Sequence, residues 1–209
     1  MAYLEEVEQA RRLKGGSFEV VQQIFGRNPT VDVNQEDSNS LRWTILAHSV
    51  TGKKDDVFRL LLSHPDIDPN TKDGLGYTAF DWACAFENLP ALKMMLHDSR
   101  VRLGSTALRN AVLQGRLNVV GWWMASGREM DFGQGGDLVQ LATDNLGKDL
   151  SVPVWNQLRI VSLLENFEKN PWSARAEVRR ELEIDGEKLL TFLLFVPADL
   201  FLGMNPQIF

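Results

Sequence analysis

The chain has 209 residues, of which 44% are hydrophobic and 24% are charged, as in an ordinary folded soluble protein. Its formal net charge of −6 argues against a nucleic-acid or anionic-membrane partner, because affinity for both depends on clustered lysine and arginine. The single cysteine, Cys84, excludes an intramolecular disulfide and suits a reducing compartment. We expect a cytoplasmic protein, with a nuclear location also possible, and no nucleic-acid or membrane partner.

We expect neither export nor a membrane-spanning segment from the two ends of this sequence. The opening residues 1–14 carry acidic side chains where a secretory signal has basic ones, and they contain no apolar run. The longest apolar stretch, residues 189–202, is interrupted by Pro197 and Asp199 and is shorter than the roughly 20 residues that span a bilayer. We interpret this stretch as buried core or a terminal cap.

Apolar residues at helical spacing predict a series of helix pairs. In chain order, the predicted pairs cover residues 3–14 and 17–26, 44–51 and 54–63, 78–86 and 89–97, and 106–113 and 117–126. A further pair begins at Asp137, and an insertion at 147–155 delays its second helix to about Asn156. Beyond it, the sequence predicts a helix of alternating charge at 172–183 and an apolar helix at 186–196.

Three sets of landmarks recur along these pairs. Thr44, Thr78 and Thr106 open similar first-helix patterns and are spaced 34 and 28 residues apart. Asn34 and Asn70 end similar loops and are 36 residues apart. The segments at 16–21 and 115–120 also resemble each other, since each has a glycine followed by an apolar pair of valines. Independent landmarks with one approximate period indicate an internal repeat.

The repeated unit resembles the ankyrin repeat. The family pattern is a turn with Asp and Gly before the motif T-P-L-H-x-A, then a glycine corner, an apolar second helix and a loop ending in Asp-Val-Asn. Matching positions in two units are Asp73, Gly76 and Thr78, and then Gly104, Thr106, Gly115 and Gly127. The motif proline is absent from every copy, and the motif histidine is replaced by Ala47, Asp81 and Arg109. The chain is therefore identified as a divergent member, and the resemblance is clearest over residues 16–133.

The resemblance implies an all-α ankyrin-repeat solenoid of about five helix–turn–helix repeats with short β-turn fingers and a helical C-terminal cap. We expect the repeats over residues 1–170 and the cap, packed on the stack, over residues 171–209. Within 1–170, we expect a degenerate repeat at 1–34, regular repeats over about 35–133, and an irregular repeat with the insertion at 134–170. The connection at 98–104 is too short for a complete finger.

Several side chains are expected to have structural roles. The three motif threonines are expected to cap their first helices, each adding about 1 kcal/mol relative to alanine. Small residues are expected where neighbouring first helices approach closely, at Ala83, Cys84 and Ala111. Of the six tryptophans, three are expected in the core, Trp82, Trp122 and Trp123, and two are expected to seal the divergent end, Trp155 and Trp172. The charges at 175–183 are expected to pair with one another on a solvated helix face.

Signals for chemistry are weak. His48, His64 and His97 are too scattered for a metal cluster, and no Cys-x-x-Cys or His-x-x-x-His spacing occurs. The glycine-rich run at 133–136 lacks the following lysine that a phosphate loop needs. We predict no metal, no cofactor and no catalytic residue. A nucleophile–base group of Cys84, Asp81 and His48 is the alternative to plain packing of these side chains, and packing is favoured.

The resemblance also implies a function and a set of partner contacts. We expect an intracellular, monomeric protein–protein interaction module that binds a partner of unknown identity through the concave surface of the stack. The predicted partner-binding residues, on the fingers and at the ends of first helices, are Leu41, Trp43, Leu75, Tyr77, Phe86, Leu113 and Gln114. Packing on a neighbouring finger explains Trp43 and Tyr77 equally well. The alternative function is a small-molecule binding protein or an enzyme, with a pocket formed by the truncated finger, the 147–155 insertion and the C-terminal cap.

Overall fold

The structure is a computed structural model that describes residues 17–27, 32–34, 36–37, 41–129, 137–148 and 152–182. Within these residues the regular structure is ten helices and no strand, so the predicted all-α solenoid architecture is confirmed. The predicted helices at 3–14 and 186–196, and most of the predicted cap, lie outside the described residues. The number of repeats and the domain boundaries stay predictions.

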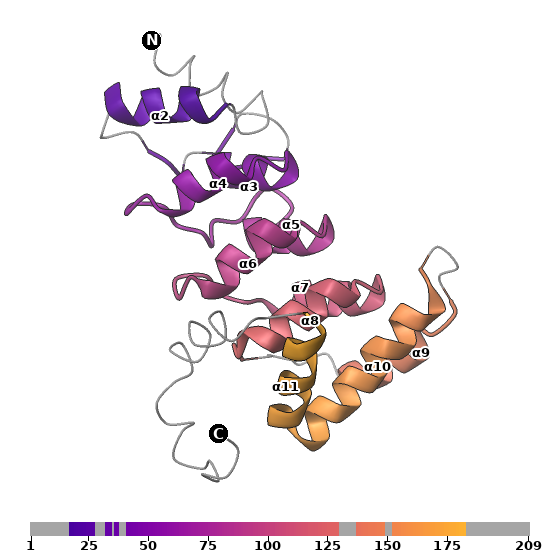
Figure 1. Cartoon of the computed structure of the whole chain (residues 1–209). Coiled ribbons are helices and arrows are strands. Elements are labelled where there is room, and N and C mark those ends of the chain that lie inside the picture. The colour runs from indigo at the N-terminus through magenta and orange to yellow at the C-terminus, as the bar shows by residue number, and fades with distance from the viewer. Residues whose placement is uncertain are drawn as a thin grey trace, which may run out of the picture.

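The helices form two layers that run along the molecule (Figure 1). One layer contains the first helix of each pair: α3 (Ile45–Thr51), α5 (Ala79–Ala85), α7 (Ser105–Leu113) and α9 (Leu138–Asp144). The other layer contains α2 (Phe18–Arg27), α4 (Asp55–Leu62), α6 (Leu89–His97), α8 (Leu117–Ser126) and α10 (Val154–Lys169). Neighbouring helices pack on each other within each layer, and each of the four pairs from α3/α4 to α9/α10 also packs together.

Helix starts are set by capping side chains. Thr44 accepts a hydrogen bond from the Ala47 amide, and Thr78 forms a reciprocal capping box with Asp81, so two of the three predicted threonine caps are confirmed. The third is wrong. Helix α7 begins at Ser105 with Gly104 as its N-cap, which places Thr106 inside the first turn.

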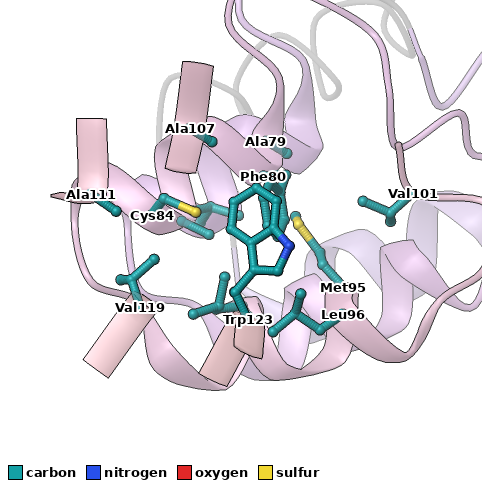
Figure 2. Close-up of a cluster of buried hydrophobic side chains, with 14 of the residues drawn as sticks. Ala79, Phe80, Cys84, Met95, Leu96, Val101, Ala107, Ala111, Val119 and Trp123 are labelled. Carbon is teal, nitrogen blue, oxygen red and sulfur yellow. The ribbon is translucent and has the colours of Figure 1, made fainter. Parts of the chain in front are cut away.

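The core lies between the two layers and is continuous along the stack. Figure 2 shows its centre, where the Trp123 indole lies against the Phe80 ring and beside Met95. The Phe80 and Trp123 rings are 5.2 Å apart at their centroids and nearly perpendicular. Trp123 is fully buried as predicted, whereas Trp122 is only half-buried and lies under the Lys93 ammonium, 3.9 Å from its centroid.

Two asparagines join successive repeats in the same way. The Asn34 side chain donates to the Asp66 carbonyl at 2.7 Å and accepts from the Asp68 amide at 2.7 Å. Asn70 repeats this pattern with the Arg100 carbonyl at 2.9 Å and the Arg102 amide at 2.7 Å. The landmark seen in the sequence therefore has a physical role, because each asparagine satisfies two backbone groups of the next loop.

The turn between the first and the second helix of a pair contains a residue with a left-handed backbone conformation, in which φ is positive. Lys53, Glu87 and Gly115 occupy this place in three consecutive pairs, with φ of 51°, 50° and 62°. Only Gly115 adopts such a backbone without steric cost. A Cβ at Gly115 would also lie 2.1 Å from the Val152 side chain, so the loop before α10 packs directly on this corner.

Two tryptophans at the C-terminal end of the stack, Trp155 and Trp172, are exposed and not buried as predicted. Helix α10 begins at Val154, so Trp155 belongs to the helix and not to the insertion. Its side chain is 72% exposed, and Trp172 at the start of α11 (Pro171–Glu181) is 38% exposed. The prediction that these two tryptophans seal the end of the stack is wrong, because both face outward.

Helix α11 packs on α8 and α10, and its charges pair with these neighbours. Arg179 is buried and donates to the Ala125 carbonyl at 2.9 Å, in the last turn of α8, where a cation is favourable. Burial lowers the pKa of the Arg179 guanidinium. Glu177 and Glu181 both accept from Arg159 of α10. The predicted self-paired, solvated face is therefore wrong.

Candidate functional site

The finger before α5 is held by one aspartate. Asp73 Oδ1 accepts from the amides of Leu75 and Tyr77, both at 2.9 Å, and its own amide donates to the Tyr77 carbonyl at 2.8 Å. Asp73 Oδ2 accepts from the Trp82 indole Nε1 at 2.8 Å. Asp73 is itself buried, so these bonds are shielded from water. The finger and the Trp82 ring are thereby fixed relative to each other.

The preceding finger is built in the same way. Asp37 Oδ1 accepts from the Trp43 amide at 3.1 Å, and Asp37 Oδ2 lies 2.8 Å from His48 Nε2. His48 and Trp82 each follow their motif threonine by four residues, so a finger aspartate holds the ring at the same repeat position twice. Sequence reasoning missed this pairing. The signal available was an aspartate ahead of each motif threonine with a ring-bearing residue four positions after it.

Four aromatic side chains gather where these two fingers meet helix α5. Trp82 is the centre, with ring centroids 5.3 Å from Trp43, 5.4 Å from Tyr77 and 5.6 Å from Phe86. The Trp82 and Phe86 rings are stacked, with an interplanar angle of 22°. We call Trp43, Tyr77, Trp82 and Phe86 the aromatic patch. Trp82, predicted to be core, is half-buried and belongs to this patch.

Exposure within this region is uneven. Phe86 is 46% exposed and Leu75, at the finger tip, is 55% exposed, whereas Trp43 and Tyr77 are half-buried. The Trp43 and Tyr77 rings each pack on Trp82 and keep an exposed portion, and their role as partner contacts stays a prediction. Large apolar side chains exposed together are the usual sign of a binding surface.

The remaining predicted contacts lie around the aromatic patch. Leu41 is half-buried, and its carbonyl accepts from the Gly74 amide at 2.7 Å, which ties the two fingers together. Leu113 is half-buried at the end of α7, and its carbonyl accepts from the Asn145 side chain at 2.7 Å. Gln114 is exposed at the C-cap of α7. The structure thus brings Trp43, Tyr77 and Phe86 together through Trp82, and Leu113 and Gln114 lie on the next first helix.

A pocket of about 250 Å³ opens between α5 and α7, beside the aromatic patch. We call it the Asp81 pocket. Its lining residues are Tyr77, Asp81, Trp82, Cys84, Ala85, Ala107, Asn110, Ala111 and Gln114. The three buried members, Cys84, Ala107 and Ala111, are all small. The pocket exists because these short side chains leave unfilled space between the two helices.

The nucleophile–base group considered from the sequence is not assembled. Cys84 and Asp81 share the Asp81 pocket, but His48 does not line it and is bound to Asp37. Cys84 is 2% exposed, and burial, together with the Asp81 charge, raises the pKa of its thiol well above the ordinary value. Since the thiolate is the nucleophilic form, Cys84 is suited to packing.

The elements named for the alternative function line two different pockets. Val152 and Pro153, from the end of the insertion, line a pocket of about 480 Å³ with Glu87 and the start of α8. Residues 98–100 of the truncated finger at 98–104 line an open groove of about 760 Å³ with α4 and α6. Among the described residues, no group of three or more His, Cys, Asp or Glu side chains is placed to hold a metal ion. None of the described helices is both long and apolar enough to span a membrane.

Comparison with known proteins gives one match. Residues 9–103 match the family model described as ankyrin repeats, in three copies. The match includes the pairs α3/α4 and α5/α6, and the two helix layers continue past residue 103 without a change in packing order. No curated protein and no solved structure matches the chain.

Proposed function

The chain is an ankyrin-repeat protein, and because ankyrin repeats generally mediate protein–protein interaction, we propose that it binds a protein partner through the concave surface formed by its fingers and first helices. The observation that carries this proposal is the aromatic patch with Leu75 at its edge. Aromatic side chains are the commonest anchors of protein interfaces, since they bury a large area and lose little rotational freedom.

The rigidity of the aromatic patch supports the same proposal. Trp82 is fixed by its hydrogen bond to Asp73 and by ring contacts on three sides. A preformed surface loses little conformational entropy on binding, so more of the buried area contributes to affinity. Phe86 and Leu75 are the most exposed of these side chains and are the expected central contacts.

The experiment compares two double variants in affinity purification from cells followed by quantitative mass spectrometry. The test variant is Leu75→Ser with Phe86→Ser. The control is Trp155→Ser with Leu158→Ser on α10, which removes another exposed apolar pair, from the other helix layer. We expect the test variant to lose its partner by at least about thirtyfold, since a contact at the centre of an interface is worth about 2 kcal/mol or more.

Folding is checked by the melting temperature, which we expect to change by less than about 3 °C in both variants because the four side chains are exposed. A folded test variant that captures the same proteins as the unmodified chain would overturn the proposal. Loss of the partner in the α10 variant alone would show that the interface lies on the layer of second helices, and this result would also overturn the proposal.

A further inference from the structure

The Asp81 pocket has a carboxylate and two aromatic rings but no cationic residue in its lining. Asp81, Tyr77 and Trp82 are half-buried along one side, and the described lining contains no lysine or arginine. The Tyr77 and Trp82 rings meet edge to face, with centroids 5.4 Å apart. Burial keeps the Cys84 thiol protonated by raising its pKa, which leaves Asp81 as the charged group of the pocket.

The orientation of the Asp81 carboxylate is fixed by the start of α5. Asp81 Oδ2 accepts from the Thr78 amide at 2.8 Å and from the Thr78 hydroxyl at 2.7 Å. The bond from the Thr78 amide is one half of the capping box, and the Asp81 amide completes it by donating to the Thr78 hydroxyl oxygen at 3.3 Å. The two bonds from Thr78 hold the carboxyl group at the pocket wall without neutralising its charge. A ligand therefore meets a preoriented anion next to aromatic faces.

Size limits the occupant to one side chain. Pockets for drug-sized ligands usually hold about 300–1,000 Å³, and the Asp81 pocket, at about 250 Å³, is below this range. An apolar side chain would leave Asp81 desolvated without a counter-charge, and an acidic one would be repelled. A cation gains from both the carboxylate and the π faces of tyrosine and tryptophan.

We propose that the Asp81 pocket receives the lysine or arginine side chain of a basic segment in the partner protein. This inference rests on the proposed function, since the pocket adjoins the aromatic patch and shares Tyr77 and Trp82 with it. The net charge of −6 on the chain favours approach of a basic segment over the same surface. The partner would thus place apolar side chains on Phe86 and Leu75 and a cation in the pocket.

The test is a titration of the ¹⁵N-labelled full chain, followed by NMR, with three small probes: N-acetyl-lysine methylamide, N-acetyl-arginine methylamide and N-acetyl-norleucine methylamide. Norleucine has the four-carbon side chain of lysine without the terminal ammonium group. We expect one or both cationic probes to shift the Trp82 indole N–H and the Asn110 side-chain amide in a saturable way, and the norleucine probe to leave them unshifted. Equal shifts with norleucine, or no saturable shift with either cation, would overturn the proposal.

A pair of matched variants isolates the carboxylate. Asp81→Asn keeps an oxygen that accepts from the Thr78 amide, so the cap of α5 is retained, but the charge is lost. Asp56→Asn removes the same charge from an exposed site at the start of α4, away from the pocket. We expect about tenfold weaker probe binding for Asp81→Asn and no change for Asp56→Asn. Equal binding by the two variants would contradict a role for Asp81.

The two proposals fail separately. If the probes do not bind while the Leu75→Ser, Phe86→Ser variant still loses its partner, the cation pocket is wrong and the proposed function stands. If the probes bind in the Asp81-dependent way while that double variant retains its partner, the pocket stands as a cation site and the proposed interface is wrong.

Discussion

Lys53 and Glu87 occupy a backbone conformation that favours glycine. Each lies two residues after a first helix, with φ near 50°, where the next repeat has Gly115. An L-residue with a side chain pays about 1–2 kcal/mol for this conformation. At Glu87 a hydrogen bond offsets part of this cost, because the Asn118 side chain donates to the Glu87 carboxylate at 2.9 Å. Lys53 is exposed at the corresponding corner and is the clearer position to test.

Lys53→Gly is therefore expected to stabilise the protein. Relief of the left-handed strain exceeds the extra chain entropy that glycine brings to the unfolded state, and we expect a net gain of about 0.5–1 kcal/mol. Urea unfolding measures the change. Lys54→Gly is the matched control, because Lys54 has a φ of −96° and no strain to relieve. A midpoint for Lys53→Gly that equals or falls below that of Lys54→Gly would contradict this account.

Cys84 is expected to be unreactive in the folded protein. Its thiol is 2% exposed, and burial, with the nearby Asp81 charge, raises its pKa well above the ordinary value, so little thiolate forms near neutral pH. Iodoacetamide at pH 8 should modify the native chain at least about a hundredfold more slowly than the urea-unfolded chain, as followed by intact mass. Rapid native modification would show that the α5–α7 contact opens readily.

Each of the two fingers is held in its conformation by one aspartate, Asp37 or Asp73. Asp73 accepts from the Leu75 amide, the Tyr77 amide and the Trp82 indole, all inside one finger and its helix. Asp73→Ala leaves these three donors without their acceptor, and we expect a loss of about 2–4 kcal/mol in the free energy of unfolding. Urea unfolding followed by tryptophan fluorescence measures it. A loss below about 0.5 kcal/mol would show that the finger does not hold Trp82 as described.

Sequence reasoning predicted the helices well and the finger contacts poorly. The α4 and α6 helices were predicted to within about one residue, because apolar spacing defines both helices, and Asn88 and Pro90 also mark the start of α6. Thr106 failed as a cap since Ser105 already starts α7 after Gly104. The Asp73–Trp82 and Asp37–His48 bonds join a finger to a helix, and a pattern of apolar residues contains no information about such pairs.

The predicted partner contacts stay predictions. Leu75 and Phe86, which repeat position alone identified, are exposed. Trp82 was misassigned to the core because a tryptophan at helical spacing is usually buried. The Asp81 pocket was not predicted. It is a space between two helices that no side chain fills, and it depends on which small residues of α5 and α7 face each other.

At the scale of the whole molecule, the repeat explains the packing order of helices α3 to α10 but not the position of the last helix, α11. Each helix from α3 to α10 packs on its pair partner and on its layer neighbours, as stacking of one unit requires. Helix α11 leaves this order and packs on both α8 and α10, held by Arg179 at the end of α8 and by Arg159 of α10. No repeat pattern specifies that arrangement, which depends on residues outside the repeated unit: these arginine contacts and the buried side chains of Ala174 and Val178.

The central claim is that the aromatic patch and its edge form the partner interface. The most direct measurement is photo-crosslinking in cells from a benzoylphenylalanine placed either at Phe86 or, as a control, at Trp155 on α10. Both side chains are exposed and aromatic, so we expect the folded chain to accept the replacement at either position. The account predicts a specific crosslinked protein from position 86 that is absent from position 155. A crosslinked partner from position 155 and none from position 86 would contradict it.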